Sequence, residues 1–236
     1  MSLLIPNHHP INPDGLVLWL DYKNTGSVAA AGTWKDYSGQ GNDGTLVGNA
    51  YVDAGGLGLD GTGDIVNCGN LATVDSATEL TAWAWVRPTS FADDNTIISQ
   101  SNGLSNGWFL WQDKVGATSG RTSTFTVALA DPSVSSIALE GATNAAVLNT
   151  WTHVVFVYKF NDTEGLRLYI NGAEDANSPI STVGMPNINS GGQPLRVGYP
   201  FFSSKYFTGD IDSVVCITRA LSAGEIQTMH QRTLRA

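Results

Sequence analysis

Short segments in which apolar and polar side chains alternate recur along this chain, and they constrain its fold more than any other feature. In residues 79–88 (ELTAWAWVRP), two tryptophans alternate with leucine, alanine and valine, so the two faces of the segment carry different side chains. A period of two is typical of strands in antiparallel sheets. The other segments of this kind are 15–22, 96–100, 107–113, 124–130, 136–141, 150–160, 166–172 and 194–199.

Helical periodicity is missing before the last dozen residues of the chain. A fold of alternating strands and helices needs amphipathic helices between its strands, so the pattern excludes that class and favours a β-sandwich. Glycine, asparagine and aspartate lie between the segments, where tight turns need them. Asn171 followed by Gly172 is the strongest of these turn signals and predicts a hairpin.

The last segment, 207–230, predicts a strand that leads directly into a short helix. β-Branched residues dominate 214–218, and Ser222 stands three places before Glu225. This spacing is typical of a capping box, in which each of the two side chains bonds to the backbone N–H of the other residue. We therefore expect a short C-terminal helix to begin after Ser222.

The composition indicates one large domain. Of the 236 residues, 42% are hydrophobic and 14% are charged, which provides enough apolar surface for a sizeable core. β-Sandwiches of about this length are commonly single domains. We predict an extended N-terminal arm, 1–13, which contains three prolines, and one β-sandwich domain, 14–236.

The chain is acidic, with a formal net charge of −9. Nucleic-acid binding needs clustered lysine and arginine, and no basic run is present, so we expect no nucleic-acid partner. No segment approaches the roughly 20 apolar residues that span a bilayer, so we expect no membrane insertion. Residues 1–15 lack the basic and apolar regions of a signal peptide, which indicates that a leader was removed or that the protein leaves its cell by another route, such as lysis.

The two cysteines, Cys68 and Cys216, are too few for a disulfide framework or a thiolate metal site. Both stand in segments typical of strands. Two buried free thiols and one disulfide both fit the sequence.

Seven sequence blocks, in one order along residues 14–231, carry a resemblance to a known family. They include WKDYSGQGNDGTLVGNA, LGLDGTGDIVNCGN, ELTAWAWVRP, LRLYINGAED and the ending at 207–230. These blocks are similar to motifs of the laminin G-like, pentraxin-like jelly-roll domains in the concanavalin A-like lectin/glucanase superfamily. The resemblance implies an all-β fold, an antiparallel two-sheet jelly-roll β-sandwich with a short C-terminal helix. Ser213 and Val215 depart from the family pattern, which has glutamate and arginine at these positions.

The resemblance also implies a structural Ca²⁺ site near the edge of the sandwich. Asp21, Asp36 and Asp212 fall where relatives of this fold bind calcium, and Asn42 lies in a glycine-rich loop that can add a ligand. Calcium takes several oxygen ligands at about 2.3–2.6 Å, which carboxylates and carbonyls supply. The alternative is that Asp36 makes turn bonds within its own loop.

Aromatic side chains suggest where a sugar can bind, because the C–H faces of sugars stack on rings. The polar loop 199–207 (YPFFSSKYF) can hardly bury all five of its rings. Two tryptophans of segment 107–113 lie on opposite faces of one strand, so at least one faces away from the interior. The predicted ligand-binding residues are Trp108, Trp111, Tyr199, Phe201, Phe202 and Tyr206. For the loop, a protein–protein interface and local packing stay open as alternatives.

Catalytic patterns are missing from the sequence. Glycosidases use two carboxylates a few ångströms apart, and enzymes of this superfamily carry them on one strand, whereas the glutamates here are isolated. We therefore predict a non-enzymatic recognition or adhesion module that binds carbohydrate or a surface glycan. The expected setting is extracellular, on a secreted surface or on a bacteriophage virion as a structural or decoration protein. The arm, 1–13, would then dock on a neighbouring protein. The alternative is a polysaccharide hydrolase or lyase of the same fold.

Overall fold

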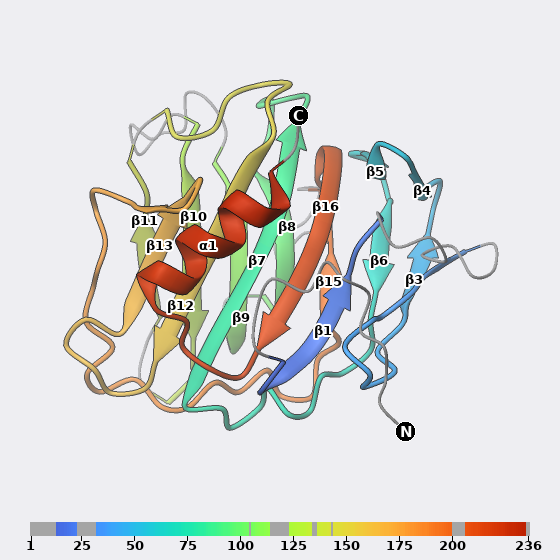
Figure 1. The fold of residues 1–236 in the computed structure, drawn as a ribbon. Helices are drawn as coiled ribbons and strands as arrows, with labels where there is room; N and C mark the ends of the chain where they lie inside the picture. The colour runs from blue at the N-terminus through green and yellow to red at the C-terminus, as the bar shows by residue number, and fades with distance from the viewer. Residues whose placement is uncertain are drawn as a thin grey trace.

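The computed structural model describes residues 13–22, 32–103, 105–113, 123–133, 136–142, 144–199 and 206–234. Within them, two antiparallel sheets are stacked on each other, and one helix, α1 (Ala223–Thr233), lies outside the stack (Figure 1). The predicted all-β sandwich with a short C-terminal helix is confirmed. Residues 1–12 of the predicted arm lie outside the described residues, so the arm stays a prediction, as does the domain boundary at residue 14.

The first sheet has eight strands in the described part of the chain, and β16 lies at its centre. Its order is β14-β13-β12-β7-β16-β5-β4, and β1 pairs with β16 as well (Figure 1). The strands are β14 (Ala173–Glu174), β13 (Leu166–Ile170), β12 (Thr152–Lys159), β7 (Glu79–Pro88), β16 (Thr208–Ile217), β5 (Gly56–Asp60), β4 (Tyr51–Asp53) and β1 (Leu16–Leu20).

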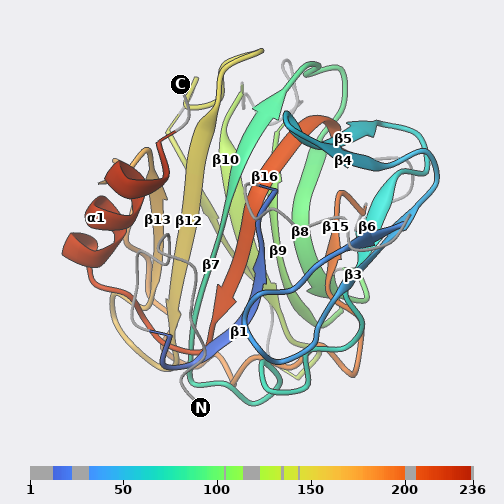
Figure 2. The same ribbon diagram turned by 45° about the vertical axis from the view of Figure 1, so that its right-hand side comes forward.

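The second sheet lies behind the first, and it also has eight strands in the described residues (Figure 2). Its order is β11-β10-β9-β8-β15-β6-β3-β2. The strands are β11 (Ile137–Glu140), β10 (Phe125–Ala130), β9 (Gly107–Gln112), β8 (Asn95–Ser101), β15 (Arg196–Val197), β6 (Ile65–Asn67), β3 (Gly44–Val47) and β2 (Thr33–Trp34).

The core fills the space between the sheets, and the period-two pattern of the sequence decides which side chains reach it. In β7, the small and aliphatic side chains at 80, 82, 84 and 86 are buried in the main core, while Trp83 and Trp85 point to the other face. In β9, the ring of Trp108 lies in the same core, 5.2 Å from the ring of Phe156 on β12. The alternation in the sequence therefore corresponds directly to the two faces of each sheet.

Both cysteines are buried free thiols in the structure, so the disulfide alternative is excluded there. Burial raises the pKa of both the Cys68 and the Cys216 thiol. A thiol with a raised pKa holds little thiolate at neutral pH, and the thiolate is the reactive form. We therefore assign packing roles to both cysteines.

Helix α1 covers the outer face of the first sheet, over β12 and β7 (Figure 1). Its N-terminus has the expected capping box: the Ser222 N–H donates to Glu225 Oε2 at 2.8 Å, and the Glu225 N–H donates to Ser222 Oγ at 3.3 Å. Ile226 and Met229 are buried against a second apolar cluster that includes Trp83. The helix therefore keeps the aromatic outer face of this sheet away from water.

Three rings stack where α1 meets the sheet. Trp85 lies 5.0 Å from His153 and 5.3 Å from His230, with both pairs nearly parallel, and its Nε1 donates to Thr233 Oγ1 on the helix. His153 is fully buried, and neither of its ring nitrogens has a hydrogen-bond partner among the described residues. Burial, and to a smaller extent the neighbouring His230, lowers the pKa of His153 from 6.5 to about 3.

The stack predicts that acid destabilises the fold. His153 stays neutral in the folded state but takes up a proton in the unfolded state below pH 6.5. The unfolded state binds the extra proton in this window, so stability is present above pH 6.5 and falls as the pH drops towards about 3. The loss is about 1.4 kcal/mol per pH unit for one group. Urea unfolding at a series of pH values measures this slope.

The matched variant is His153→Phe, which keeps a ring in the stack but cannot be protonated. The free energy of unfolding of this variant should fall less steeply with decreasing pH than that of the wild type. The expected difference in slope is that of one titrating group, about 1.4 kcal/mol per pH unit. Carboxylates titrate in both proteins, so the difference between the two slopes isolates His153. Equal slopes would show that this histidine does not titrate on unfolding.

Candidate functional site

Asp36, one of the predicted calcium ligands, acts as an acceptor for its own loop. Its Oδ1 accepts the N–H groups of Trp19 and Ser38, both at 2.9 Å. Its Oδ2 accepts Ser38 Oγ at 2.7 Å and the Asn42 N–H at 2.8 Å. The carboxylate therefore ties the loop 36–42 to β1, which is the turn-bonding alternative considered from the sequence.

The other predicted metal ligands are Asn42, Asp212 and Asp21. Asn42 turns its side-chain amide to the Val17 carbonyl, to which Nδ2 donates at 2.8 Å. Asp212 is 1% exposed and accepts Ser213 Oγ at 3.2 Å, and Asp21 follows the end of β1. In the part of the chain that the structure describes, no three His, Cys, Asp or Glu side chains form a group that could hold a metal ion. The metal stays a prediction from the resemblance.

Removing Asp36 should destabilise the fold whether or not calcium is present. Asp36→Ala leaves four donors without their charged acceptor, so we expect the free energy of unfolding to fall by about 2–4 kcal/mol. Asp53→Ala is the matched control, because Asp53 is exposed and accepts the Gly55 N–H only two residues away. The measurement is urea unfolding of the wild type and of both variants, once in calcium and once in chelator.

The same experiment tests the calcium prediction. Calcium that raises the stability of the wild type but not of Asp212→Ala supports a metal site. Identical unfolding in calcium and in chelator contradicts it. A loss on Asp36→Ala that appears only in calcium would contradict the loop-bonding role of this residue.

The two tryptophans of β9 face opposite sides of the second sheet, as the alternation predicts. Trp108 is 0% exposed in the core, so its prediction as a ligand contact is wrong: a fully buried ring offers no face to a sugar. Trp111 points outward, but it is only 7% exposed. Its ring packs 5.3 Å from Phe109, and its Nε1 donates to Asp113 Oδ1 at 2.9 Å. Trp111 therefore packs within the outer face of the sheet and offers little ring surface to a ligand.

A single row of side chains crosses the outer face of the second sheet from β11 to β2. Residues paired across antiparallel strands point to the same face, so the strand register defines this row. Its members are Ala138, Ala128, Phe109, Ser99, Arg196, Asn67, Thr45 and Thr33. Arg196 is the one charged member, and it stands between the polar side chains of Ser99 and Asn67.

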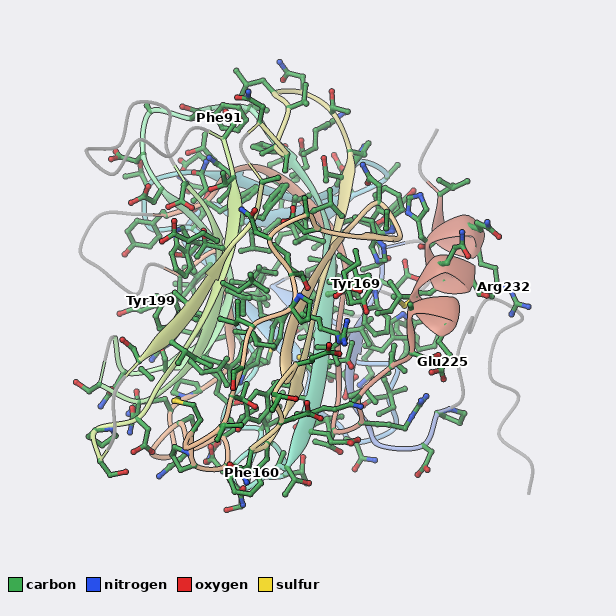
Figure 3. The ribbon with its side chains drawn as sticks, turned by 90° about the vertical axis from the view of Figure 1, so that its left-hand side faces the viewer. Phe91, Phe160, Tyr169, Tyr199, Glu225 and Arg232 are labelled. Carbon is green, nitrogen blue, oxygen red and sulfur yellow. The ribbon has the colours of Figure 1, made fainter. Side chains whose placement is uncertain are left out.

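One predicted tyrosine lies beside this arginine, and a second lies beside the first. The guanidinium carbon of Arg196 lies 4.3 Å from the ring centre of Tyr199, and the ring of Tyr206 stands edge-on to Tyr199 at 6.4 Å. All three side chains are partly exposed. Figure 3 places Tyr199 on the side of the molecule opposite α1. We call Arg196, Tyr199 and Tyr206 the arginine–tyrosine site; Phe201 and Phe202 of the same predicted set lie outside the described residues.

A cleft of about 280 Å³ lies at another edge of the molecule, where β4, β5 and β16 meet. Tyr51 on β4 is 55% exposed and lies across Gly58 on β5, its partner in the ladder. A Cβ atom at Gly58 would come within 2.4 Å of the tyrosine ring, so only glycine leaves room for it. This pair was missed in the sequence, where the one signal was a glycine inside a strand, which often marks a close approach.

The carboxylates of the cleft are held as hydrogen-bond acceptors. Asp64 accepts the N–H groups of Asn49 and Asp60, at 2.5 and 3.1 Å. Asp210 pairs with Arg87, whose Nη2 lies 2.9 Å from its Oδ2. Both carboxylates therefore have partners within the protein.

Comparison with known proteins identifies the family to which this fold belongs. The family model described as the concanavalin A-like lectin/glucanases superfamily matches residues 60–227. The chain belongs to this superfamily. No curated protein sequence gives a significant match.

The solved structures with a similar fold include receptor-binding domains and domains in complex with sugars. The receptor binding domain of botulinum neurotoxin C/D mosaic serotype superimposes with a TM-score of 0.69 at 18% identity, over 94% of this chain and 52% of that one. The botulinum neurotoxin serotype D ligand binding domain, in complex with N-acetylneuraminic acid, gives a TM-score of 0.67 at 17% identity, over 94% and 52%. The chain thus spans about half the length of these neurotoxin domains.

A third structure matches over almost its whole length. Domain 4 of AbnA, a GH43 extracellular arabinanase from Geobacillus stearothermophilus, in complex with arabinotriose, gives a TM-score of 0.63 at 18% identity, over 92% of this chain and 98% of that one. At this identity the likeness establishes the fold. Within the described residues, no helix is long and apolar enough to cross a membrane.

Proposed function

We propose that this protein is a non-enzymatic carbohydrate-recognition module that binds its ligand on the outer face of the second sheet. The observation that carries the proposal is the arginine–tyrosine site, where the guanidinium of Arg196 lies over the partly exposed ring of Tyr199 and a second partly exposed ring, Tyr206, contacts Tyr199. Tyrosine rings offer an apolar face for the C–H groups of a sugar and a hydroxyl at their edge. Asn67, which flanks Arg196 in the row and is partly exposed, adds a polar group for sugar hydroxyls.

The fold supports this assignment because proteins that share it over all or part of their length have been solved in complex with sugars. Arabinotriose is bound by the arabinanase domain, and N-acetylneuraminic acid by the neurotoxin domain. A scaffold hosts many functions, so the site has to carry the argument. In this chain, α1 covers the outer face of the first sheet, and the arginine–tyrosine site lies on the opposite side (Figure 3).

The expected setting is extracellular, on a secreted surface or on a virion. The arabinanase that contains the matching domain is an extracellular protein.

In a virion, the arm 1–13 would dock on a neighbouring protein and leave the sandwich facing outward. Deletion of residues 1–13 should then abolish incorporation into the particle, while the urea unfolding curve of the sandwich is unchanged. Incorporation of the deleted protein at the wild-type level contradicts this role for the arm.

Binding to a glycan array tests the carbohydrate proposal. We expect the wild type to bind, and Tyr199→Ala and Tyr206→Ala to weaken binding by about tenfold each, as for the loss of one aromatic contact of about 1–1.5 kcal/mol. Phe160→Ala is the matched control, because Phe160 is an exposed ring at a different place on the molecule (Figure 3). A blank array across plant, algal and bacterial glycans would contradict the proposal.

The competing function is a polysaccharide hydrolase or lyase. It requires release of reducing ends from a polysaccharide, and it requires that one carboxylate change, such as Asp60→Asn in the cleft, abolish that release. Asp60 is exposed and accepts the Thr62 N–H through one oxygen. Turnover that depends on such a residue would overturn the non-enzymatic assignment.

A further inference from the structure

Arg196 carries a positive charge that no aspartate or glutamate side chain of the described residues pairs with. The other partly buried arginines of the described residues are paired: Arg87 with Asp210, Arg167 with Glu164 and Glu174, and Arg219 with Glu225. The Arg196 side chain has no ion pair and no hydrogen bond within the described residues. Its one polar interaction there is with the Tyr199 ring, at 4.3 Å.

The segments outside the described residues do not change this conclusion. They are 1–12, 23–31, 104, 114–122, 134–135, 143, 200–205 and 235–236, and none contains aspartate or glutamate. All 21 acidic side chains of the chain therefore lie in the described part, and none of them pairs with Arg196. Among the partly buried arginines of the described residues, Arg196 is therefore the one without an acidic partner.

The position of Arg196 favours binding of an anion from solvent. β15 lies between β8 and β6, and the ladder fixes the backbone at 196 on both sides. The guanidinium carbon lies over the Tyr199 ring, an interaction that uses none of the guanidinium N–H groups as donors to oxygen, so these groups can make hydrogen bonds to a ligand. Arginine presents these donors as a planar fork that matches the two oxygens of a carboxylate.

We propose that the ligand of the arginine–tyrosine site is an acidic saccharide, of the uronic or sialic acid type, whose carboxylate pairs with Arg196. The inference rests on the proposed carbohydrate function and specifies its ligand class. The carboxylate binds at the edge of the guanidinium, and the sugar ring contacts Tyr199 or Tyr206. The net negative charge of the protein repels anionic glycans in general. Binding therefore depends on this one arginine, which gives the site its selectivity.

Calorimetry with a matched set of probes tests the proposal. Oligogalacturonate and sialyllactose carry the carboxylate, while methyl-esterified oligogalacturonate and lactose are their neutral counterparts. We expect at least one acidic probe to bind roughly tenfold or more tightly than its neutral counterpart, because a charge-assisted pair is among the stronger hydrogen bonds. The preference should shrink as sodium chloride is added.

Variants at 196 separate charge from shape. Arg196→Gln should remove the preference for the acidic probe, and Arg196→Lys should restore part of it, since lysine keeps the charge but loses the fork. Arg232→Gln is the matched control: it removes the same charge from exposed helix α1, on the side opposite Tyr199 (Figure 3), and should leave binding unchanged. Melting curves establish that each variant is folded.

The outcomes distinguish this inference from the proposed function. Equal binding of acidic and neutral probes, unchanged by Arg196→Gln, overturns the acidic-ligand assignment and leaves carbohydrate recognition standing. Binding of a sulfated oligosaccharide such as a heparin fragment, with no binding of either carboxylated probe, shows that the anion is sulfate and overturns the carboxylate assignment. A wild type that binds no glycan overturns both.

Discussion

The hydrogen-bond ladder between β16 and β7 is the interaction on which the rest of the structure depends. β16 also pairs with β1 and β5, so the end of the chain holds together segments from its beginning and its middle. The ladder shifts register between Asp212 and Val215, and Ser213 adopts a positive φ of 50° at this point. Such a bulge twists a strand, which lets β16 follow both β7 and β1. Gly209 lets β16 approach β7 closely, because a Cβ atom at this position would come within 2.3 Å of the Arg87 carbonyl oxygen.

The same strand makes the two outer faces of the sandwich unequal. α1 follows β16 after a few residues, so the helix must lie on the first sheet, where it covers Trp83 and stacks His230 on Trp85. The outer face of the second sheet carries a different row, in which Ser99, Arg196 and Asn67 are neighbours. The outer face of the first sheet is therefore aromatic and covered by α1, because the helix directly follows the last strand. The outer face of the second sheet carries the guanidinium of Arg196.

The sequence predicted those features that depend on local patterns. Alternation identified the strands and the opposite faces of Trp108 and Trp111, and the spacing of Ser222 and Glu225 identified the helix start. Alternation does not say which face is inside, and for that reason Trp108 was wrongly included among the ligand contacts. For Asp36, the calcium and the turn-bonding interpretations differ in what approaches the carboxylate, and the structure shows backbone N–H groups of its own loop and of Trp19 on β1.

The features that the sequence did not predict depend on pairing between distant segments. Arg196 stands in a short strand, and nothing in its local sequence shows that Ser99 and Asn67 lie beside it. Tyr51 and Gly58 belong to one hairpin, yet their contact follows from the register of that hairpin rather than from either residue alone. Long-range register is set by the whole core, because a one-residue slip would turn the apolar face of a strand outward.

The unpaired state of Arg196 is best understood as a cost that the fold sustains for binding. A guanidinium that loses part of its hydration without gaining a carboxylate is unfavourable, and a nearby acid would relieve it. An internal acid would also compete with any anionic ligand for the same donors. Because Arg196 is held by a strand and by the Tyr199 ring, little rotamer freedom is lost when a ligand arrives, so more of the interaction contributes to affinity. A rigid arginine left without an acid is therefore better suited to recognition than to stability.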